Sequence, residues 1–453
     1  MNSKESPAES SWDEALREAV SGGAAQAISA PSLFLEERED AVVEIDDRLG
    51  RTEERRSRIR GMSASGAAPE AGLAFRGDPV TDDAALLVLA ASGSEPLGAR
   101  PARNDSESRP EVALPVAGAI KLLEQLVEKS RCLQPTATVR ARWVGFRQSI
   151  RVARAGRPVV RDLRRGSRIR LEARSGGEKP ASAVVESVIS PELARVEPLL
   201  DRLPREVAAR LDERRRTRTL SSGEHVVVFA PGVGGILVHE LVGHALEADA
   251  VLGRASWLSE VEGEVGPKEL TVVDDPRRGR AGWRTDDEGE SARPVALLRE
   301  GRVAAWMHDL TSSRESGQAA TGHGRRASYR DPVRPRMGCT WVAAGRHHPS
   351  DALEGIHDGI YVRRMEAAST DPRSGRSVFR VTDADRIHRG RLDAALAPHV
   401  IMLDAAPALN GIERIGSDLE FDRCIGSCLR GGQPLATSVG APTFRLGLIT
   451  AMF

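Results

Sequence analysis

His239, Glu240 and His244 are the residues whose types and spacing are best suited to chemistry. They lie in the stretch VVVFAPGVGGILVHELVGHALEAD, which covers residues 226–249. In zinc hydrolases, imidazoles commonly hold the metal and a carboxylate beside them takes the proton of a water molecule. The three side chains therefore indicate either a zinc hydrolase site or two histidines that are simply packed or solvated on an amphipathic helix, and the rest of the chain has to decide between them.

The two histidines are five positions apart, in the pattern H-E-x-x-x-H, whereas H-E-x-x-H separates them by four. On a regular helix five positions turn the chain by roughly 140°, too far for both rings to reach one ion easily. Gly243 precedes His244 and permits the backbone to widen into a π-turn or to break. Either distortion would bring the two rings closer together, so the five-residue spacing does not exclude a shared ion.

A third ligand has to come from elsewhere in the chain. The four cysteines are Cys132, Cys339, Cys424 and Cys428. Cys132 follows a predicted helix in a half of the chain that has no histidine, and it is expected to be a buried small residue. Cys428 lies in a glycine-flanked segment that is open enough to approach an ion, but spacing alone leaves both Cys424 and Cys428 as candidates.

The local pattern predicts which elements carry the site. The apolar run from Val226 to Phe229 predicts a buried strand, Pro231 to Gly235 a turn, and Ile236 onward a helix. All ten histidines lie from His225 onward, so a site that depends on histidine must be built in the second half.

The first half contains two helical patterns and several short strands. Helices are predicted over 115–131 and 191–218, and strands over 136–144, 148–153, 158–160 and 167–173, in an antiparallel meander. The second half has many short strand candidates between turns. We expect an α+β fold: an N-terminal α/β domain with antiparallel strands (1–220) and a β-rich, barrel-like C-terminal domain (221–453) that carries the H-E-x-x-x-H helix.

The bulk composition narrows the classes of function. The chain has 453 residues, with 65 Lys and Arg against 65 Asp and Glu, and 4% aromatic residues. Zero net charge and few aromatic residues disfavour a nucleic-acid-binding surface. The N-terminus has no apolar signal core, and no apolar run approaches about 18 residues. We expect a cytoplasmic chain with neither a nucleic-acid nor a membrane partner.

Six sequence blocks, in the same order, resemble the TldD/PmbA metalloprotease family in its catalytic TldD-like branch. That branch has the same H-E-x-x-x-H spacing. The first 110 or so residues diverge from the family, His323 stands where the family has Asn, and Leu429-Arg430 replaces Gly-Lys. The blocks are residues 231–249, 286–289 (DDEG), 321–337 (TGHGRR, SY and PRM), 374–379, 426–433 and 439–443.

The resemblance implies one zinc ion per catalytic chain, with His239, His244 and Cys428 as its ligands. It further implies that a zinc-activated water attacks the peptide bond and that Glu240 is the general base. The substrates would be small or unfolded peptides, and the partner either a second copy or an inactive TldE/PmbA-like homologue in a dimer. The alternative function is a catalytically decayed subunit that binds zinc or peptide.

Two of the blocks contain charged residues whose roles, in substrate binding or in structure, the sequence does not decide. His323, Arg325 and Arg326 are candidate substrate contacts, in which the arginines either bind a peptide carboxylate or brace a loop. The block Asp286 to Gly289 predicts either a hairpin turn or a functional site.

Overall fold

Alternating apolar residues organise the first half of the chain into one antiparallel sheet. The computed structural model describes residues 17, 32–65, 73–74, 114–176, 180–261, 263–280, 282–422 and 426–453. In it, β1 (Ser32–Asp46) and β2 (Arg51–Ser65) form a hairpin. The sheet has the order β3-β2-β1-β4-β5-β6 and is antiparallel throughout, as predicted.

The strands are longer than the sequence predicts. The segments 136–144 and 148–153 belong to one strand, β4 (Ala137–Arg154), because residues 145–147 stay extended and pair with both β1 and β5. Residue 160 and the segment 167–173 likewise belong to one strand, β5 (Val160–Ser175), because the residues between them pair with β4, whereas residues 158 and 159 lie just outside it. The remaining strands are β6 (Ala181–Ile189) and β3 (Leu73–Ala74).

Two helices cover one face of this sheet. The first, α3 (Val116–Leu133), confirms the helix predicted over 115–131, and α4 (Glu197–Arg214) is shorter than the helix predicted over 191–218. Leu123, Trp143 and Leu211 belong to the core between helices and sheet. The prediction that Cys132 is buried is wrong: it is exposed because it lies in the last turn of α3, away from the face that packs on the sheet.

A closed barrel forms in the second half, as predicted. Its strands follow one another in the order β14-β7-β22-β17-β15, and β15 pairs with β14 to close the ring. The β14–β7 pair is parallel, and the other pairs of the ring are antiparallel. The bounds are β7 (Gly223–Phe229), β14 (Asp358–Asp371), β15 (Arg376–His388), β17 (His399–Asp404) and β22 (Phe444–Met452), with β16 (Arg391–Ala395) on β15 and β18 (Ile412–Ile415) on β22.

A second sheet, of order β10-β9-β8-β13-β21-β19, packs beside the barrel, and β20 pairs with β21. A helical segment, residues 235–252, shares one apolar core with both sheets. The strands of the second sheet are β8 (Val272–Asp274), β9 (Val295–Arg299), β10 (Arg302–Val303), β13 (Cys339–Val342), β19 (Glu420–Phe421), β20 (Gly426–Arg430) and β21 (Gln433–Ala441). The short remaining elements are α7 (Leu310–Ser316), β11 (Gly324–Arg325), β12 (Arg334–Pro335), η4 (Pro349–Ala352) and α8 (Ala405–Asn410).

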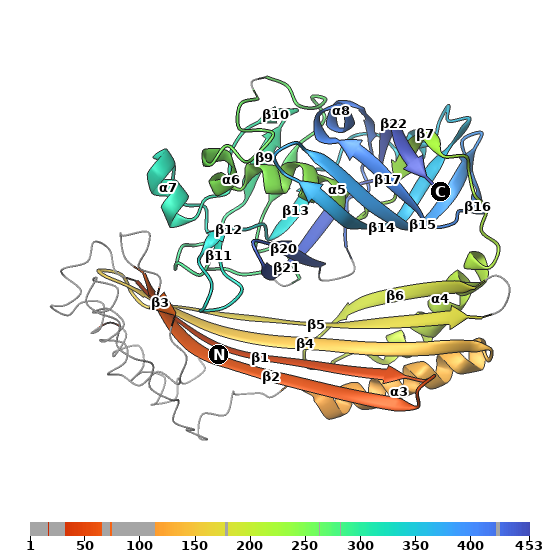
Figure 1. The fold of residues 1–453 in the computed structure, drawn as a ribbon, viewed down its shortest axis with the longest axis horizontal. Helices are drawn as coiled ribbons and strands as arrows, with labels where there is room; N and C mark the ends of the chain where they lie inside the picture. Colours follow the sequence, from red (N-terminus) through yellow and green to blue (C-terminus); the bar gives the residue numbers. More distant parts are fainter. Residues whose placement is uncertain are drawn as a thin grey trace.

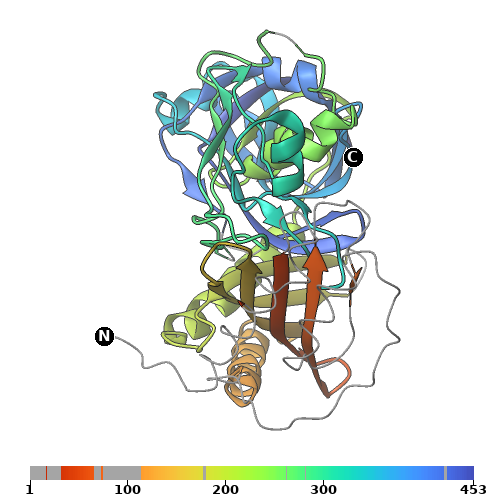
Figure 2. The same ribbon diagram turned by 90° about the vertical axis from the view of Figure 1, so that its left-hand side faces the viewer.

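The C-terminal half is stacked on the face of the N-terminal sheet opposite to α3 (Figures 1 and 2). Residues 215–222 link α4 to β7, close to the predicted boundary at residue 220; the division into two domains stays a prediction. No helix within the described ranges is long and apolar enough to cross a membrane.

Candidate metal centre

The turn before the histidine helix is glycine-rich because other strands approach it closely. A Cβ atom on Gly234 would lie 1.9 Å from Cε1 of Phe444, and one on Gly235 would lie 2.6 Å from the backbone nitrogen of Gly440. Gly232 has φ +84°, a conformation that favours glycine. The turn therefore seats the start of the helix directly against β22 and β21.

The helix that carries the histidines contains one of the two distortions that the sequence left open, a widened turn. It begins as α5 (Gly235–Val238), widens into a π-turn, η2 (His239–Gly243), tightens into a 3-10 turn, η3 (His244–Leu246), and continues as α6 (Ala248–Leu252). The backbone N–H of His244 donates to the carbonyl of His239, five positions back. Widening the turn to five residues brings the two rings onto one side of the helix.

Glycine is required at position 243 for a steric reason, and not for the backbone freedom that the sequence suggested. Its φ of −58° is ordinary for a helix, so no special backbone conformation requires glycine. A Cβ atom there would lie 1.9 Å from the sulfur of Met337, which is buried in the barrel core. The glycine therefore provides room for Met337 to pack against the π-turn.

The structure brings His239, His244 and Cys428 together. One ligand atom from each lies within 4.8 Å of the others, and all three residues are buried. Sγ of Cys428, on β20, lies 3.3 Å from Nε2 of His244. The two imidazole ring centres are 5.1 Å apart and nearly perpendicular, at 83°. Cys424, the other cysteine left open by spacing, lies outside the described residues.

The three groups perturb one another electrostatically. Burial alone would raise the pKa of the Cys428 thiol, but the imidazoles of His244 and His239 outweigh burial and lower it to about 5. Burial would lower the pKa of His244, yet Glu247 and Cys428 raise it well above the ordinary value. The pKa of His239 is also raised, because contact with Cys428 outweighs burial. A divalent cation bound here would displace the imidazole protons and balance the thiolate charge.

This donor set fits zinc. Imidazole nitrogen and thiolate sulfur are both zinc ligands, and three protein ligands that converge in a buried site leave a fourth position open, as in catalytic zinc sites. Glu240 lies beside them, with Oε2 3.9 Å from Nε2 of His244. The three donors and Glu240 thus match the parts that a zinc hydrolase requires.

The centre opens into a cleft of about 720 Å³. The cleft lies between the N-terminal sheet with α4 and the C-terminal half of the chain. The residues that line it include His239, Glu240 and Cys428 from the centre, Arg168, Arg170, Glu186, Glu206 and Arg210 from the first half, and Tyr361, Arg363, Arg364, Met365, Phe421 and Asp422 from the second.

Glu247 supports the site although the sequence analysis did not select it. Its Oε2 lies 3.0 Å from Nδ1 of His244, and the carboxylate is fully buried. A glutamate three positions after a ligand histidine is a signal that could have identified it, because such residues are neighbours on a helical surface.

His323, Arg325 and Arg326 are buried, and none of them lines the cleft around the metal centre. Nε2 of His323 lies 3.1 Å from Oδ1 of Asp274. The guanidinium of Arg325 lies 4.1 Å over the ring of Trp283, and that of Arg326 lies 4.4 Å over the ring of Phe34, on β1. This geometry favours the alternative in which the arginines brace a loop; a role in substrate binding stays untested.

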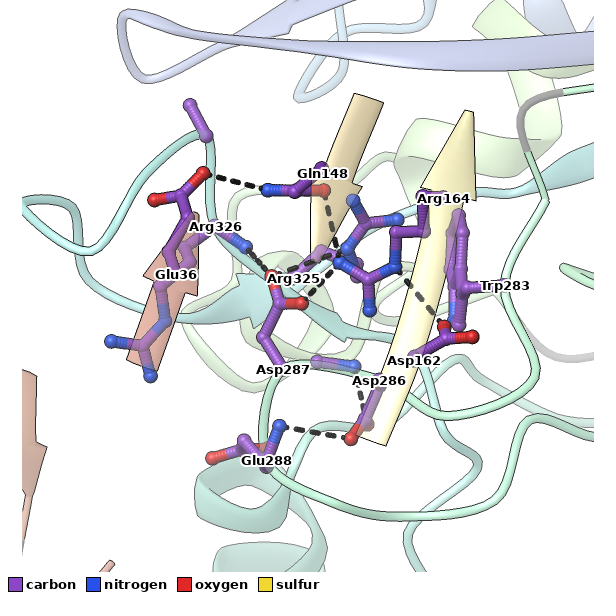
Figure 3. Close-up of polar contacts among 12 residues, drawn as sticks. Glu36, Gln148, Asp162, Arg164, Trp283, Asp286, Asp287, Glu288, Arg325 and Arg326 are labelled. Atoms are coloured by element: carbon purple, nitrogen blue, oxygen red, sulfur yellow. Dashed lines mark hydrogen bonds and ion pairs between the residues drawn. The ribbon is translucent and has the colours of Figure 1, made fainter. Parts of the chain in front are cut away.

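The block Asp286 to Gly289 forms a turn that ties the two halves of the chain together (Figure 3). Asp286 accepts backbone hydrogen bonds from Glu288, Glu290 and Gly324, and Gly289 has φ +81°.

The next residue of that block, Asp287, reaches the N-terminal sheet. It accepts a 2.6 Å hydrogen bond from Arg164 of β5 and a 2.7 Å bond from the backbone of Arg326 (Figure 3). The block therefore has a structural role that the sequence left open.

Comparison with known proteins places these observations in a family. Residues 222–451 match the family described as PmbA/TldA metallopeptidase C-terminal domain. A metalloprotease TldD homolog from Haemophilus influenzae is 31% identical over 227 residues, which is 49% of this chain and 47% of that protein. A zinc metalloprotease TldD homolog from Saccharolobus solfataricus is 29% identical over 233 residues, 50% of this chain and 51% of that protein. The chain spans about half the length of the curated relatives that it matches.

Solved structures share the fold over nearly the whole chain. A structure from Thermotoga maritima has a TM-score of 0.74 at 16% identity and covers 97% of this chain and 100% of its own. TldE from Thermococcus kodakarensis has a TM-score of 0.72 at 12% identity, with 95% and 98% covered. The likeness in fold therefore includes the N-terminal sheet, which the match over residues 222–451 does not reach.

Proposed function

The chain belongs to the PmbA/TldD metallopeptidase family, and on that basis we propose that it is a zinc-dependent peptidase that hydrolyses small or unfolded peptides. The observation that carries this proposal is the convergence of His239, His244 and Cys428 beside Glu240, at the wall of a cleft. A relative named as a zinc metalloprotease supports zinc as the metal.

Each residue of the centre has a distinct role in this proposal. The two imidazoles and the thiolate hold one zinc ion, which supplies Lewis-acid polarisation of a carbonyl group and of water when bound. Glu240 faces the same cleft and accepts the proton of the attacking water molecule. It then returns that proton to the nitrogen of the leaving amine, which completes hydrolysis of the peptide bond.

The position of the cleft supports an extended peptide as the substrate. Its walls come from both halves of the chain, so a substrate has to enter between the N-terminal sheet and the barrel. An extended backbone can lie in such a space and pair with a sheet edge, whereas a folded protein presents no free backbone there.

We also propose that the working unit is a dimer, formed with a second copy or with an inactive TldE-like homologue. The support is that TldE from Thermococcus kodakarensis has the same fold. Light scattering of the purified chain, alone and mixed with such a homologue, tests this proposal. A monomer under both conditions would contradict it.

The peptidase proposal is tested with a random peptide pool and mass spectrometry. The zinc-loaded chain, alone and with the homologue, is compared with a zinc-loaded Glu240→Gln chain. We expect new cleavage products of the peptide pool from the wild type only. In a parallel digest of casein, we expect the wild type to cut the denatured protein but not the native one. If the zinc-loaded wild type forms no products, either alone or with the homologue, the result supports the alternative function, a catalytically decayed subunit that binds zinc or peptide. Equal products from both chains would exclude Glu240 as the base.

A further inference from the structure

The two best-defined donors of the metal centre come from elements far apart in the chain. His244 lies in the helical segment, and Cys428 lies on β20, in a hairpin with β21. Their donor atoms are nevertheless 3.3 Å apart. A metal site needs its ligands held to within a fraction of an ångström, so further side chains have to fix these two elements against each other.

Glu247 fixes the imidazole of His244. Its Oε2 lies 3.0 Å from Nδ1 of that ring, which leaves Nε2 facing the sulfur of Cys428. A carboxylate at Nδ1 holds the proton there and keeps Nε2 free as the ligand atom. His239 has no such support, because its Nδ1 is buried without a hydrogen-bond partner in the described part of the chain.

A fully buried carboxylate is costly to maintain unless cations face it, and two arginines face Glu247. Nε of Arg430 lies 3.1 Å from Oε2, and Nε of Arg336 lies 3.7 Å from Oε1. Arg430 also contacts Asp249 at 2.8 Å. Arg430 stands at the position where the family pattern has lysine, so the positive charge at this position is kept.

Arg336 reaches the cysteine strand with its remaining donors. Its Nη2 donates to the carbonyl oxygen of Cys428 at 2.8 Å, and its Nη1 donates to the carbonyl oxygen of Gln433 at 3.0 Å. The side chain is almost completely buried. One guanidinium thus contacts the carboxylate that orients His244 and both strands of the hairpin that carries Cys428. A lysine ammonium cannot span these three positions, because it is a single point charge.

From this geometry we infer that Arg336 and Glu247 are positioning residues of the metal centre, which set how tightly the chain binds zinc. Glu247 orients His244, and Arg336 holds the backbone of Cys428 at the correct distance from it. This inference rests on the proposed zinc site, but not on the proposed peptidase activity.

The test measures zinc affinity of the full chain by competition with a chromophoric chelator. The variants are Arg336→Lys and Glu247→Gln, and Arg334→Lys is the matched control, because Arg334 is half-exposed and its guanidinium pairs with Asp249 rather than with Glu247. We expect Arg336→Lys and Glu247→Gln to bind zinc about 10- to 100-fold more weakly. Arg334→Lys should bind zinc like the wild type.

Cobalt spectroscopy separates positioning from general destabilisation. With Co²⁺ in place of zinc, the thiolate charge-transfer and ligand-field bands report the geometry of the ligand set. We expect both bands to shift in Arg336→Lys, and thermal unfolding without metal identifies any variant that has lost its fold. If Arg336→Lys does not fold, the same measurements are made on Glu247→Gln alone, because its amide is nearly isosteric with the carboxylate that it replaces.

Two results would overturn the inference. One is wild-type zinc affinity together with a wild-type cobalt spectrum in folded Arg336→Lys and Glu247→Gln chains. The other is a wild-type chain that binds neither metal, which would also remove the proposed function. A wild-type chain that binds zinc but cuts no peptide would contradict the peptidase proposal alone, because the affinity comparison does not depend on turnover.

Discussion

Sγ of Cys428 lies 3.3 Å from Nε2 of His244, although 184 positions separate the two residues in the chain. Both side chains are more than nine-tenths buried, so solvent screens the attraction between the thiolate and the imidazole only weakly. This pair defines where a metal ion would sit, and it can be tested by removing one partner.

Cys428→Ser is expected to abolish most metal binding. A serine hydroxyl does not ionise near neutral pH and is a poor zinc ligand, so only two protein donors would remain. Elemental analysis of the purified chain should give close to one zinc in the wild type and little in the variant. Cys132→Ser, at an exposed position on α3, is the control and should keep its zinc. Equal zinc in the two variants would move the third ligand to another residue, with Cys424 as the first candidate.

Glu240→Gln is expected to separate metal binding from turnover. The amide is nearly isosteric with the carboxylate but cannot accept a proton, and Glu240 is not one of the three converging donors. Zinc content should therefore stay at the wild-type level, while peptide hydrolysis falls by about 10²- to 10⁴-fold. Single-turnover kinetics on a defined peptide measure this loss, and undiminished hydrolysis would contradict the assigned role.

Gly243→Ala is expected to destabilise the chain through Met337. The added methyl group would lie 1.9 Å from the Met337 sulfur, so the buried side chain has to move at a cost of roughly 1–3 kcal/mol. A double-mutant cycle with Met337→Ala, followed by urea unfolding, measures the coupling. If the clash is the cause, Met337→Ala should cost less in the Gly243→Ala background than in the wild type. Additive effects would mean that the two residues act independently.

Arg164→Ala is expected to cost far more than the loss of an exposed ion pair. Arg164 and Asp287 are both buried, and their 2.6 Å contact joins the N-terminal sheet to the C-terminal half. Removing the arginine leaves a buried carboxylate without its main partner, at a cost of about 3–5 kcal/mol. Arg140→Ala removes an arginine from the more exposed pair with Asp46 and should cost at most about 1 kcal/mol. If denaturant unfolding shows that both variants lose the same free energy of unfolding, the buried ion pair contributes no more to stability than the exposed one.

Two buried carboxyls, Asp286 and Glu288, are expected to contribute a stabilisation that decreases as pH rises. Burial raises the pKa of Asp286 to about 7, and burial together with the charge of Asp286 raises that of Glu288 to about 8. Between about pH 4 and pH 8 the folded chain therefore holds protons that the unfolded chain has released. The resulting stabilisation is fully present below about pH 4 and is lost as the pH rises through these two values.

Glu288→Gln tests this pH dependence. The variant removes one of the two titrations, so the free energy of unfolding of the wild type should fall relative to that of the variant between about pH 5 and about pH 9. Glu315→Gln changes an exposed glutamate on α7 and should leave the wild-type slope unchanged. A Glu288→Gln chain with the wild-type slope would show that Glu288 ionises normally in the folded state.

The sequence by itself determined the chemistry of the site and most of its local structure. The spacing of His239 and His244, with Gly243 between them, showed that a regular helix would separate the two rings and that a local distortion could bring them together, because helical geometry depends on neighbouring residues alone. The apolar patterns located α3, α4 and the strand before the histidines. The resemblance to a family pointed to Cys428 as the candidate third ligand, since spacing could not choose between it and Cys424.

Only the tertiary structure decided how distant residues cooperate. That Gly243 makes room for Met337, that Arg325 and Arg326 stack on buried rings, and that Arg336 contacts both Glu247 and the Cys428 strand all depend on contacts across many positions. No local pattern encodes such contacts, because they arise when separate elements pack around a common core. Local spacing therefore identified the two histidines and left two cysteines open as candidate metal ligands, and packing determined which of the described side chains meet and what holds them in place.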